Sequence, residues 1–174
     1  MGLLDFFRKK RMSVEDVAQV LWVICCETAK HTYHELSELI SEFELDDDEQ
    51  GVLRYELIIV NLWAVTLSVH QTPSGETILD ELHCNFLNTF KKHGEMESIP
   101  SIMSDIDQRY KEYSSLWNDK EPSFMLYFKI LTNMFNNGDP DKRLLHASLK
   151  IQANIFSVCE ASLSFITKIR VDRN

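Results

Sequence analysis

Four side chains between residues 27 and 38 have types and spacings that could bind a metal ion. Glu27, His31, His34 and Glu38 follow one another at intervals of four, three and four residues. On a helix these intervals place all four on one strip, where imidazole and carboxylate groups can converge on a transition metal. Asp80 and His83 lie three residues apart and could add ligands from a second, facing helix.

The same strip lacks the ligand spacings of the common helical metal sites. The sequence contains no Glu-x-x-His, no His-x-x-x-His and no His-Glu-x-x-His. A solvated polar face is the simpler interpretation, and a pH-sensitive histidine contact is a further one. The sequence therefore assigns no catalytic, cofactor-binding or metal residue. A metal-binding helical-bundle enzyme using Glu27, His31 and His34, with His83 as a further ligand, stays an alternative hypothesis.

Glu56 and Asn61 stand out because they are polar residues in the most apolar stretch, Leu53 to His70. Between Leu57 and Val69 only Asn61, Thr66 and Ser68 are polar, and a run this short falls below the ~20 residues that span a bilayer. We expect a buried core helix in which Asn61 and Ser68 mark where a neighbour supplies hydrogen bonds. Glu56 is expected near the start of that helix, partly exposed and facing the helix dipole.

Other chemical motifs are excluded by spacing. The acidic run 42–49, EFELDDDE, fails the calcium-loop pattern because the twelfth position from Asp46 is Leu57 instead of a glutamate. It is predicted to be a solvated turn that caps the next helix. The glycines form no G-x-G-x-x-G or P-loop, and no G-x-S-x-G is present. The cysteines form no C-x-x-C pair and are expected to be free, buried thiols in a reducing cytosol: Cys25, Cys26, Cys84 and Cys159.

The elements that carry these residues are predicted to be helices. Only five glycines and four prolines interrupt 174 residues, and the apolar residues recur at helical spacing. We expect an all-α single domain over 13–174, a bundle of six or seven helices around a central apolar helix (about 52–70) and a long C-terminal helix (about 142–170). Whether residues 13–44 form one helix or two is open, with a break expected near Thr32 and Tyr33.

The C-terminal helix carries two apolar stripes side by side. One stripe contains Leu144, Ser148, Ile151, Ile155, Val158, Ser162, Phe165 and Ile169, and the other contains Leu145, Leu149, Gln152, Phe156, Cys159, Leu163 and Ile166. Together they exceed the single face of an ordinary surface helix. The sequence therefore predicts that this helix buries both sides, inside the bundle or against another chain, which makes a homodimer an expectation.

The charge is unevenly distributed along the chain. Residues 1–12 hold Arg8, Lys9, Lys10 and Arg11 against Asp5, a net of +3, so the remainder of this −9 chain carries −12. This negative charge disfavours binding to nucleic acid, because proteins bind nucleic acid by neutralising its phosphates with basic side chains. Residues 1–11 also hold an apolar patch beside the bases, so this basic amphipathic segment could meet an anionic membrane surface or fold as a short turn against the domain.

The function predicted from the sequence is a non-enzymatic helical interaction or regulatory protein of unknown partner, which could be homodimeric. An acidic antagonist of a basic protein, such as an immunity or antitoxin protein, is one specific version. The alternatives are the metal-dependent enzyme above and peripheral membrane attachment through residues 1–11. A cytoplasmic location is expected, because the bases follow the apolar patch instead of preceding it as in a signal peptide.

Overall fold

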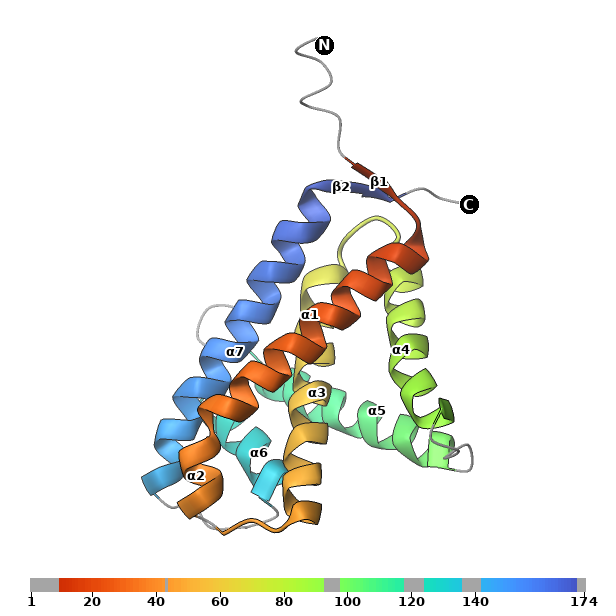
Figure 1. Ribbon diagram of the computed structural model, residues 1–174. Helices are drawn as coiled ribbons and strands as arrows, with labels where there is room; N and C mark the ends of the chain where they lie inside the picture. The colour runs from red at the N-terminus through yellow and green to blue at the C-terminus, as the bar shows by residue number, and fades with distance from the viewer. Residues whose placement is uncertain (1–9, 43, 93–97, 118–123, 136–141, 172–174) are drawn as a thin grey trace.

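The computed structural model describes residues 10–42, 44–92, 98–117, 124–135 and 142–171. These residues form seven helices and one pair of short strands, which confirms the all-α prediction (Figure 1). In chain order the elements are β1 (Lys10–Met12), α1 (Val14–Glu35), α2 (Ser37–Glu42), α3 (Asp47–Val69), α4 (Gly75–Lys92), α5 (Ile99–Leu116), α6 (Phe124–Phe135), α7 (Lys142–Thr167) and β2 (Ile169–Val171).

Helix α3 is the centre of the bundle, as the apolar run predicts. It contacts α1, α4, α5, α6 and α7. Residues 59–65 are all buried, so α3 is covered on every side along this stretch. Helix α3 is also long and apolar enough to pass a length and composition test for a membrane span, but 67% of the window that passes is buried inside the bundle. Helix α3 is therefore a core helix, because the neighbouring helices remove its apolar surface from water.

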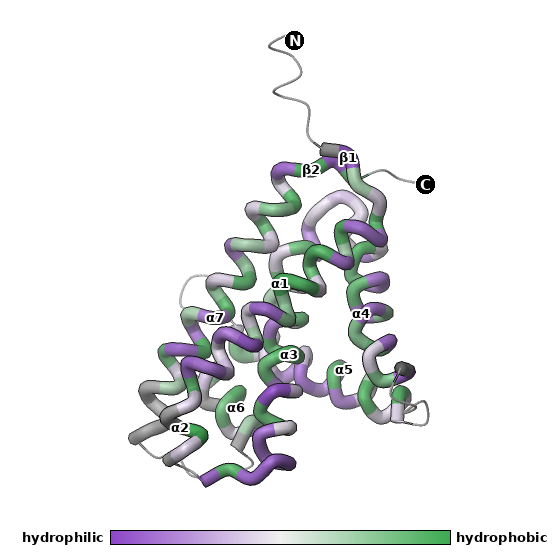
Figure 2. Tube along the Cα trace, in the orientation of Figure 1, coloured by the Kyte–Doolittle hydropathy of each residue, from purple (hydrophilic) through white to green (hydrophobic). Residues whose placement is uncertain are grey.

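The sequence also determines where several helices begin and end. Ser13 caps α1 by accepting a hydrogen bond from the Asp16 amide at 3.1 Å. Asp46 and Glu49 form a reciprocal capping box at the start of α3, so the acidic run caps this helix as predicted (Figure 2 shows this hydrophilic start). Residues 14–42 form two helices, and the break lies at Leu36 instead of near Thr32.

The strands are a feature that the sequence did not indicate. β1 and β2 pair in parallel, with Lys10 opposite Ile169, Arg11 opposite Arg170 and Met12 opposite Val171. Ile169 is buried and Met12 is half-buried against the core, which holds the pair on the end of the bundle. Helix α7 therefore ends at Thr167. Of the predicted N-terminal segment 1–12, residues 1–9 lie outside the described residues.

Candidate functional site

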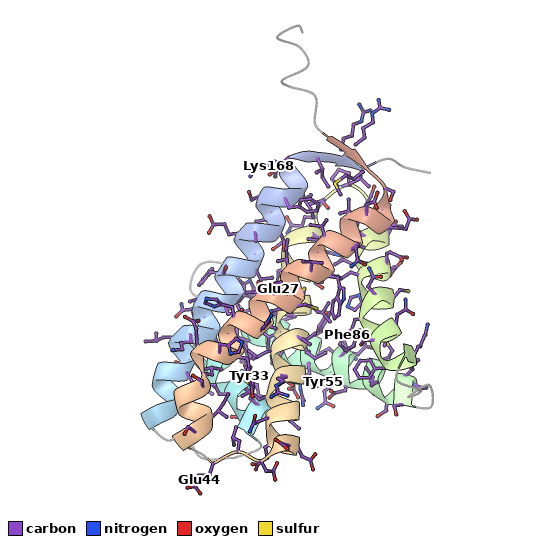
Figure 3. All side chains as sticks on the ribbon, viewed as in Figure 1. Glu27, Tyr33, Glu44, Tyr55, Phe86 and Lys168 are labelled. Atoms are coloured by element: carbon purple, nitrogen blue, oxygen red, sulfur yellow. The ribbon has the colours of Figure 1, made fainter. Side chains whose placement is uncertain are left out.

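The described members of the predicted metal strip lie on the exposed face of α1. Glu27, His31 and His34 are exposed, and Figure 3 labels Glu27 on the outside of α1. His31 lies 3.6 Å from Glu35, one helical turn further on. The Glu38 side chain lies outside the described part of the structure. In the part that is described, no three His, Cys, Asp or Glu side chains gather closely enough to hold a metal ion.

His83, the proposed additional ligand, lies in a different environment from the strip. Its Nδ1 is 2.7 Å from the Leu79 carbonyl oxygen, and its Nε2 is 3.0 Å from the Tyr110 hydroxyl. Both ring nitrogens are therefore engaged within the bundle, where the ring connects α4 to α5. Asp80 is exposed on α4. Among the side chains that the structure describes, neither Asp80 nor His83 joins the α1 strip in a group of three.

Glu56 lies among several charged side chains of the described protein. The sequence-based expectation that Glu56 is partly exposed is wrong. It lies in the third turn of α3 and is only 1% exposed, instead of partly exposed near the helix start. The prediction failed because α3 begins at Asp47, which moves Glu56 inward along the helix. Arg109 donates from Nε to Glu56 Oε2 at 3.2 Å, and the Tyr113 hydroxyl donates to Glu56 Oε1.

Further residues of α3, α5 and α6 surround Glu56, Arg109 and Tyr113. We call this whole group the Glu56 cluster. Arg109 also lies 3.7 Å from Asp105 and 3.8 Å from Glu112. Glu112 in turn lies 3.4 Å from Lys129 of α6. The hydrogen bonds that close the cluster are Tyr55 Oη to Asp105 Oδ2 at 3.1 Å, Gln108 Nε2 to Glu112 Oε1 at 3.1 Å and Asn133 Nδ2 to Tyr113 Oη at 3.2 Å.

Burial governs the protonation of the central carboxyl. Desolvation raises the pKa of Glu56 to about 7, against the opposing effect of the Arg109 guanidinium. The nearby Asp105 and Glu112 carboxylates raise the same pKa further. The cluster therefore binds or releases a proton near neutrality. Glu56 and Tyr113 are almost fully buried. The contacts of the Glu56 cluster therefore attach α5 to α3 and α6.

A second buried polar group joins α1, α3 and α7. Thr32 donates to Asn154 Oδ1 at 2.8 Å, Asn154 donates to Asn61 Oδ1 at 2.6 Å, and Asn61 donates to the Cys25 carbonyl oxygen at 2.9 Å. The prediction that a neighbour supplies hydrogen bonds to Asn61 is confirmed, and Ser68 likewise reaches the Cys159 carbonyl oxygen of α7 at 3.4 Å. These bonds fix the relative position of the three longest helices.

The cysteines do not form disulfides, and only one of them is fully buried. Cys25 is buried, Cys26 and Cys159 are half-buried, and Cys84 is exposed, which corrects the expectation of four buried thiols. Burial raises the pKa of Cys25, and it raises the pKa of Cys26 to about 11. These two groups remain thiols at neutral pH, and the thiol is a poor nucleophile compared with the thiolate.

A surface cleft of about 360 Å³ lies between α1 and α4. It is lined by Gln19, Trp22, Asn85, Asn88, Thr89 and Lys91. This lining offers amide and hydroxyl hydrogen bonds, one aromatic ring and one positive charge. It holds no carboxylate, imidazole or thiol, the side chains that most often serve as general acids and bases.

Helix α7 exposes three large apolar side chains, more than any other helix among the described residues. Of the first predicted stripe, Ser148, Ile151, Ile155, Val158 and Ser162 are buried and Phe165 is half-buried, whereas Ile169 lies in β2 and the Leu144 side chain is outside the described part of the structure. The second is only partly covered: Leu149 is 58% exposed, Phe156 is 45% exposed and Leu163 is 44% exposed. The remaining exposed residues between Leu149 and Leu163 are small or carry one charge: Ala153, Ser157, Glu160 and Ala161.

We call the face that runs from Leu149 through Phe156 to Leu163 the α7 outer face. Its three large residues are spaced by seven, and seven residues are two helical turns, so they form one line about 21 Å long. Phe156 also contacts Trp117 at the end of α5, with 6.2 Å between ring centroids. Large apolar side chains exposed in line are a recognised mark of an interaction surface.

Comparison with protein-family models, curated proteins and solved structures gave no match. The fold therefore defines the protein by class alone, as an all-α helical bundle. Sequence reasoning found the second α7 stripe and Asn61, but it missed Arg109, Tyr113 and Asn154. Their partners lie 53, 57 and 93 residues away along the chain, and one sequence gives no signal for such pairs.

Proposed function

We propose that the protein is a non-enzymatic interaction module that pairs with a second copy of itself through the α7 outer face. The observation that carries the proposal is the line of Leu149, Phe156 and Leu163, each 44% exposed or more. Removing such side chains from water stabilises a complex by roughly 25 cal/mol per Å² of apolar surface. A second α7 offers a surface of the same length and composition.

The stripe is symmetric about Phe156, which supports a two-fold axis beside this residue. Leu149 and Leu163 each lie seven positions from it. In an antiparallel pair, Leu149 of one copy faces Leu163 of the other, as an isologous interface requires. Glu160 then faces the neutral Gln152 of the second copy. In a parallel pair the two Glu160 carboxylates would face each other, and like charges in contact are unfavourable.

The test is the oligomeric state of the wild-type protein and of Phe156→Glu, measured by sedimentation equilibrium. We expect a dimer for the wild type and an affinity weakened about 30-fold or more for the variant, because a central apolar contact is replaced by two carboxylates. Val52→Glu is the matched control, since Val52 is 47% exposed but lies on α3. Leu163→Glu repeats the test at a position away from the Trp117 contact.

Two results would overturn the proposal. One is a wild-type protein that stays monomeric at high concentration. The other is a dimer that Phe156→Glu and Leu163→Glu leave unchanged while circular dichroism shows both variants to be folded.

A further inference from the structure

The cleft between α1 and α4 is lined mainly by polar side chains, unlike the α7 outer face. Figure 1 shows that the two helices lie close together at their N-terminal ends and diverge towards their C-terminal ends. Gln19 and Trp22 lie three residues apart on α1, and Asn85, Asn88 and Lys91 follow one another at intervals of three on α4. Each helix therefore presents one strip of side chains to the cleft. The volume of about 360 Å³ is at the lower end of the range for small-molecule sites.

The three carboxamides of the cleft are available to a ligand. Gln19, Asn85 and Asn88 form no side-chain hydrogen bond with another described residue. Thr89 donates its hydroxyl to the Phe86 carbonyl oxygen at 2.7 Å, which leaves its own oxygen as an acceptor. Each carboxamide holds a donor and an acceptor side by side in one plane. This arrangement matches the neighbouring donor and acceptor on the edge of an adenine ring.

The indole ring of Trp22 gives the cleft a flat apolar surface. Trp22 is half-buried and meets Phe86 edge-on, with 5.9 Å between ring centroids and an interplanar angle of 71°. Phe86, which Figure 3 labels on α4, is only 2% exposed, so its contact holds the indole in place. An edge-on contact covers at most one face of the indole. An uncovered aromatic face is a surface on which a nucleobase stacks.

Lys91 adds a positive charge to the cleft. It is exposed and forms no ion pair with another described residue. The side chains that line the cleft include no carboxylate, which would repel an anionic ligand. Lys91 lies six residues beyond Asn85, about 9 Å along the helix axis. A nucleotide spans such a separation between the edge of its base and its phosphate.

We propose that this cleft binds an adenine nucleotide that carries one phosphate. The base stacks on Trp22, its edge bonds to the carboxamides, and its phosphate pairs with Lys91. A polynucleotide would bring many phosphates to a protein whose net charge is −9, whereas a mononucleotide brings only one. The sequence has no P-loop, so a lysine side chain takes the place of backbone amides at the phosphate. This binding does not depend on pairing through α7.

The test is isothermal titration calorimetry of the full chain with three ligands: adenosine 5′-monophosphate, adenosine and ribose 5-phosphate. We expect adenosine 5′-monophosphate to bind with a Kd below about 1 mM. Adenosine should bind about five-fold more weakly, because an exposed ion pair contributes up to about this factor. Ribose 5-phosphate should bind at least about ten-fold more weakly, because it lacks the base that stacks on Trp22.

Two variants separate the contact with the phosphate from the contact with the base. Lys91→Gln should weaken the binding of adenosine 5′-monophosphate about five-fold and leave that of adenosine unchanged. Asn85→Ala should weaken the binding of both ligands about five-fold, because each loses a hydrogen bond. Lys111→Gln, which removes an exposed base on α5, is the control that should change neither affinity.

Three results would overturn the proposal of a nucleotide site. The first is no binding of adenosine 5′-monophosphate at concentrations of several millimolar. The second is ribose 5-phosphate binding as tightly as adenosine 5′-monophosphate, which would show that the base is not recognised. The third is an affinity for adenosine 5′-monophosphate that is the same in Lys91→Gln, Asn85→Ala and the Lys111→Gln control.

Discussion

At the scale of single residues, we expect the buried Glu56 carboxyl to make stability depend on pH. Its pKa in the folded protein, about 7, is higher than its ordinary value near 4.5. Between these values the folded state binds more protons than the unfolded state, so the free energy of unfolding decreases as the pH rises. Above about pH 7 this contribution is fully lost. A difference of about 2.5 pKa units corresponds to a destabilisation of the order of 3 kcal/mol.

We therefore predict that Glu56→Gln flattens the pH dependence of stability between about pH 5 and pH 7. Glutamine keeps the shape of the side chain and still offers a hydrogen-bond acceptor to Tyr113. Arg109 keeps two carboxylates, Asp105 and Glu112, within 3.8 Å. The measurement is urea unfolding at a series of pH values. Asp80→Asn, an exposed carboxylate on α4, is the control that should keep the wild-type slope. An unchanged slope in Glu56→Gln would contradict the assignment of this proton to Glu56.

At the scale of elements, the turn between α3 and α4 requires a glycine at position 75. An added Cβ there would lie 2.3 Å from the Val69 carbonyl oxygen and 3.1 Å from that of His70. Both atoms belong to the backbone at the end of α3, so they cannot move without opening the turn. Gly51, in contrast, lies in the first turns of α3 and has no atom within 4 Å of such a Cβ.

The two glycines should consequently respond to alanine in opposite ways. Gly75→Ala should destabilise the protein by about 1–3 kcal/mol, as overpacking does. Gly51→Ala should stabilise it by up to about 1 kcal/mol, since alanine is the better helix former. Urea midpoints of the two variants and the wild type measure both effects. A Gly75→Ala protein as stable as Gly51→Ala would show that the turn is not constrained by this contact.

The elements were largely predictable from the sequence because their signals are local. Ser13, Asp46 with Glu49, and the apolar run of α3 each act within a few residues, and the helices follow from them. The break at Leu36 was misplaced because no glycine or proline marks it. The β1–β2 pair could not be predicted, since it joins strands of three residues about 160 positions apart. The Glu56 cluster was missed for the same reason: its members meet only through tertiary packing.

At the scale of the whole molecule, the proposed pairing surface and the strand pair lie at different places along the bundle. The α7 outer face covers the middle of α7, from Leu149 to Leu163, and β2 follows the end of this helix at Thr167. An antiparallel pair about Phe156 would therefore carry one β1–β2 pair at each end. A parallel pair would place both β1–β2 pairs at the same end. The orientation of the pair thus determines the shape of the dimer, so it needs a direct measurement.

Cysteine cross-linking can measure this orientation, and the symmetry of the stripe predicts the result. In a Cys84→Ser background, which removes the exposed native thiol, Leu149→Cys protein mixed with Leu163→Cys protein should form a disulfide between copies. Neither variant alone should do so, because in the antiparallel arrangement equivalent positions lie roughly 21 Å apart along the helix axes. A disulfide requires Cα atoms within about 7 Å.

The parallel alternative predicts the reverse pattern, in which each single variant cross-links with itself and the mixture adds nothing specific. The parent Cys84→Ser protein reports any cross-linking through the half-buried Cys159, which the antiparallel arrangement places opposite Ala153 of the other copy. Cross-linking confined to the mixture, and abolished by adding Phe156→Glu to both variants, would establish the antiparallel pair. Cross-linking in either single variant would show that the symmetry about Phe156 does not set the orientation.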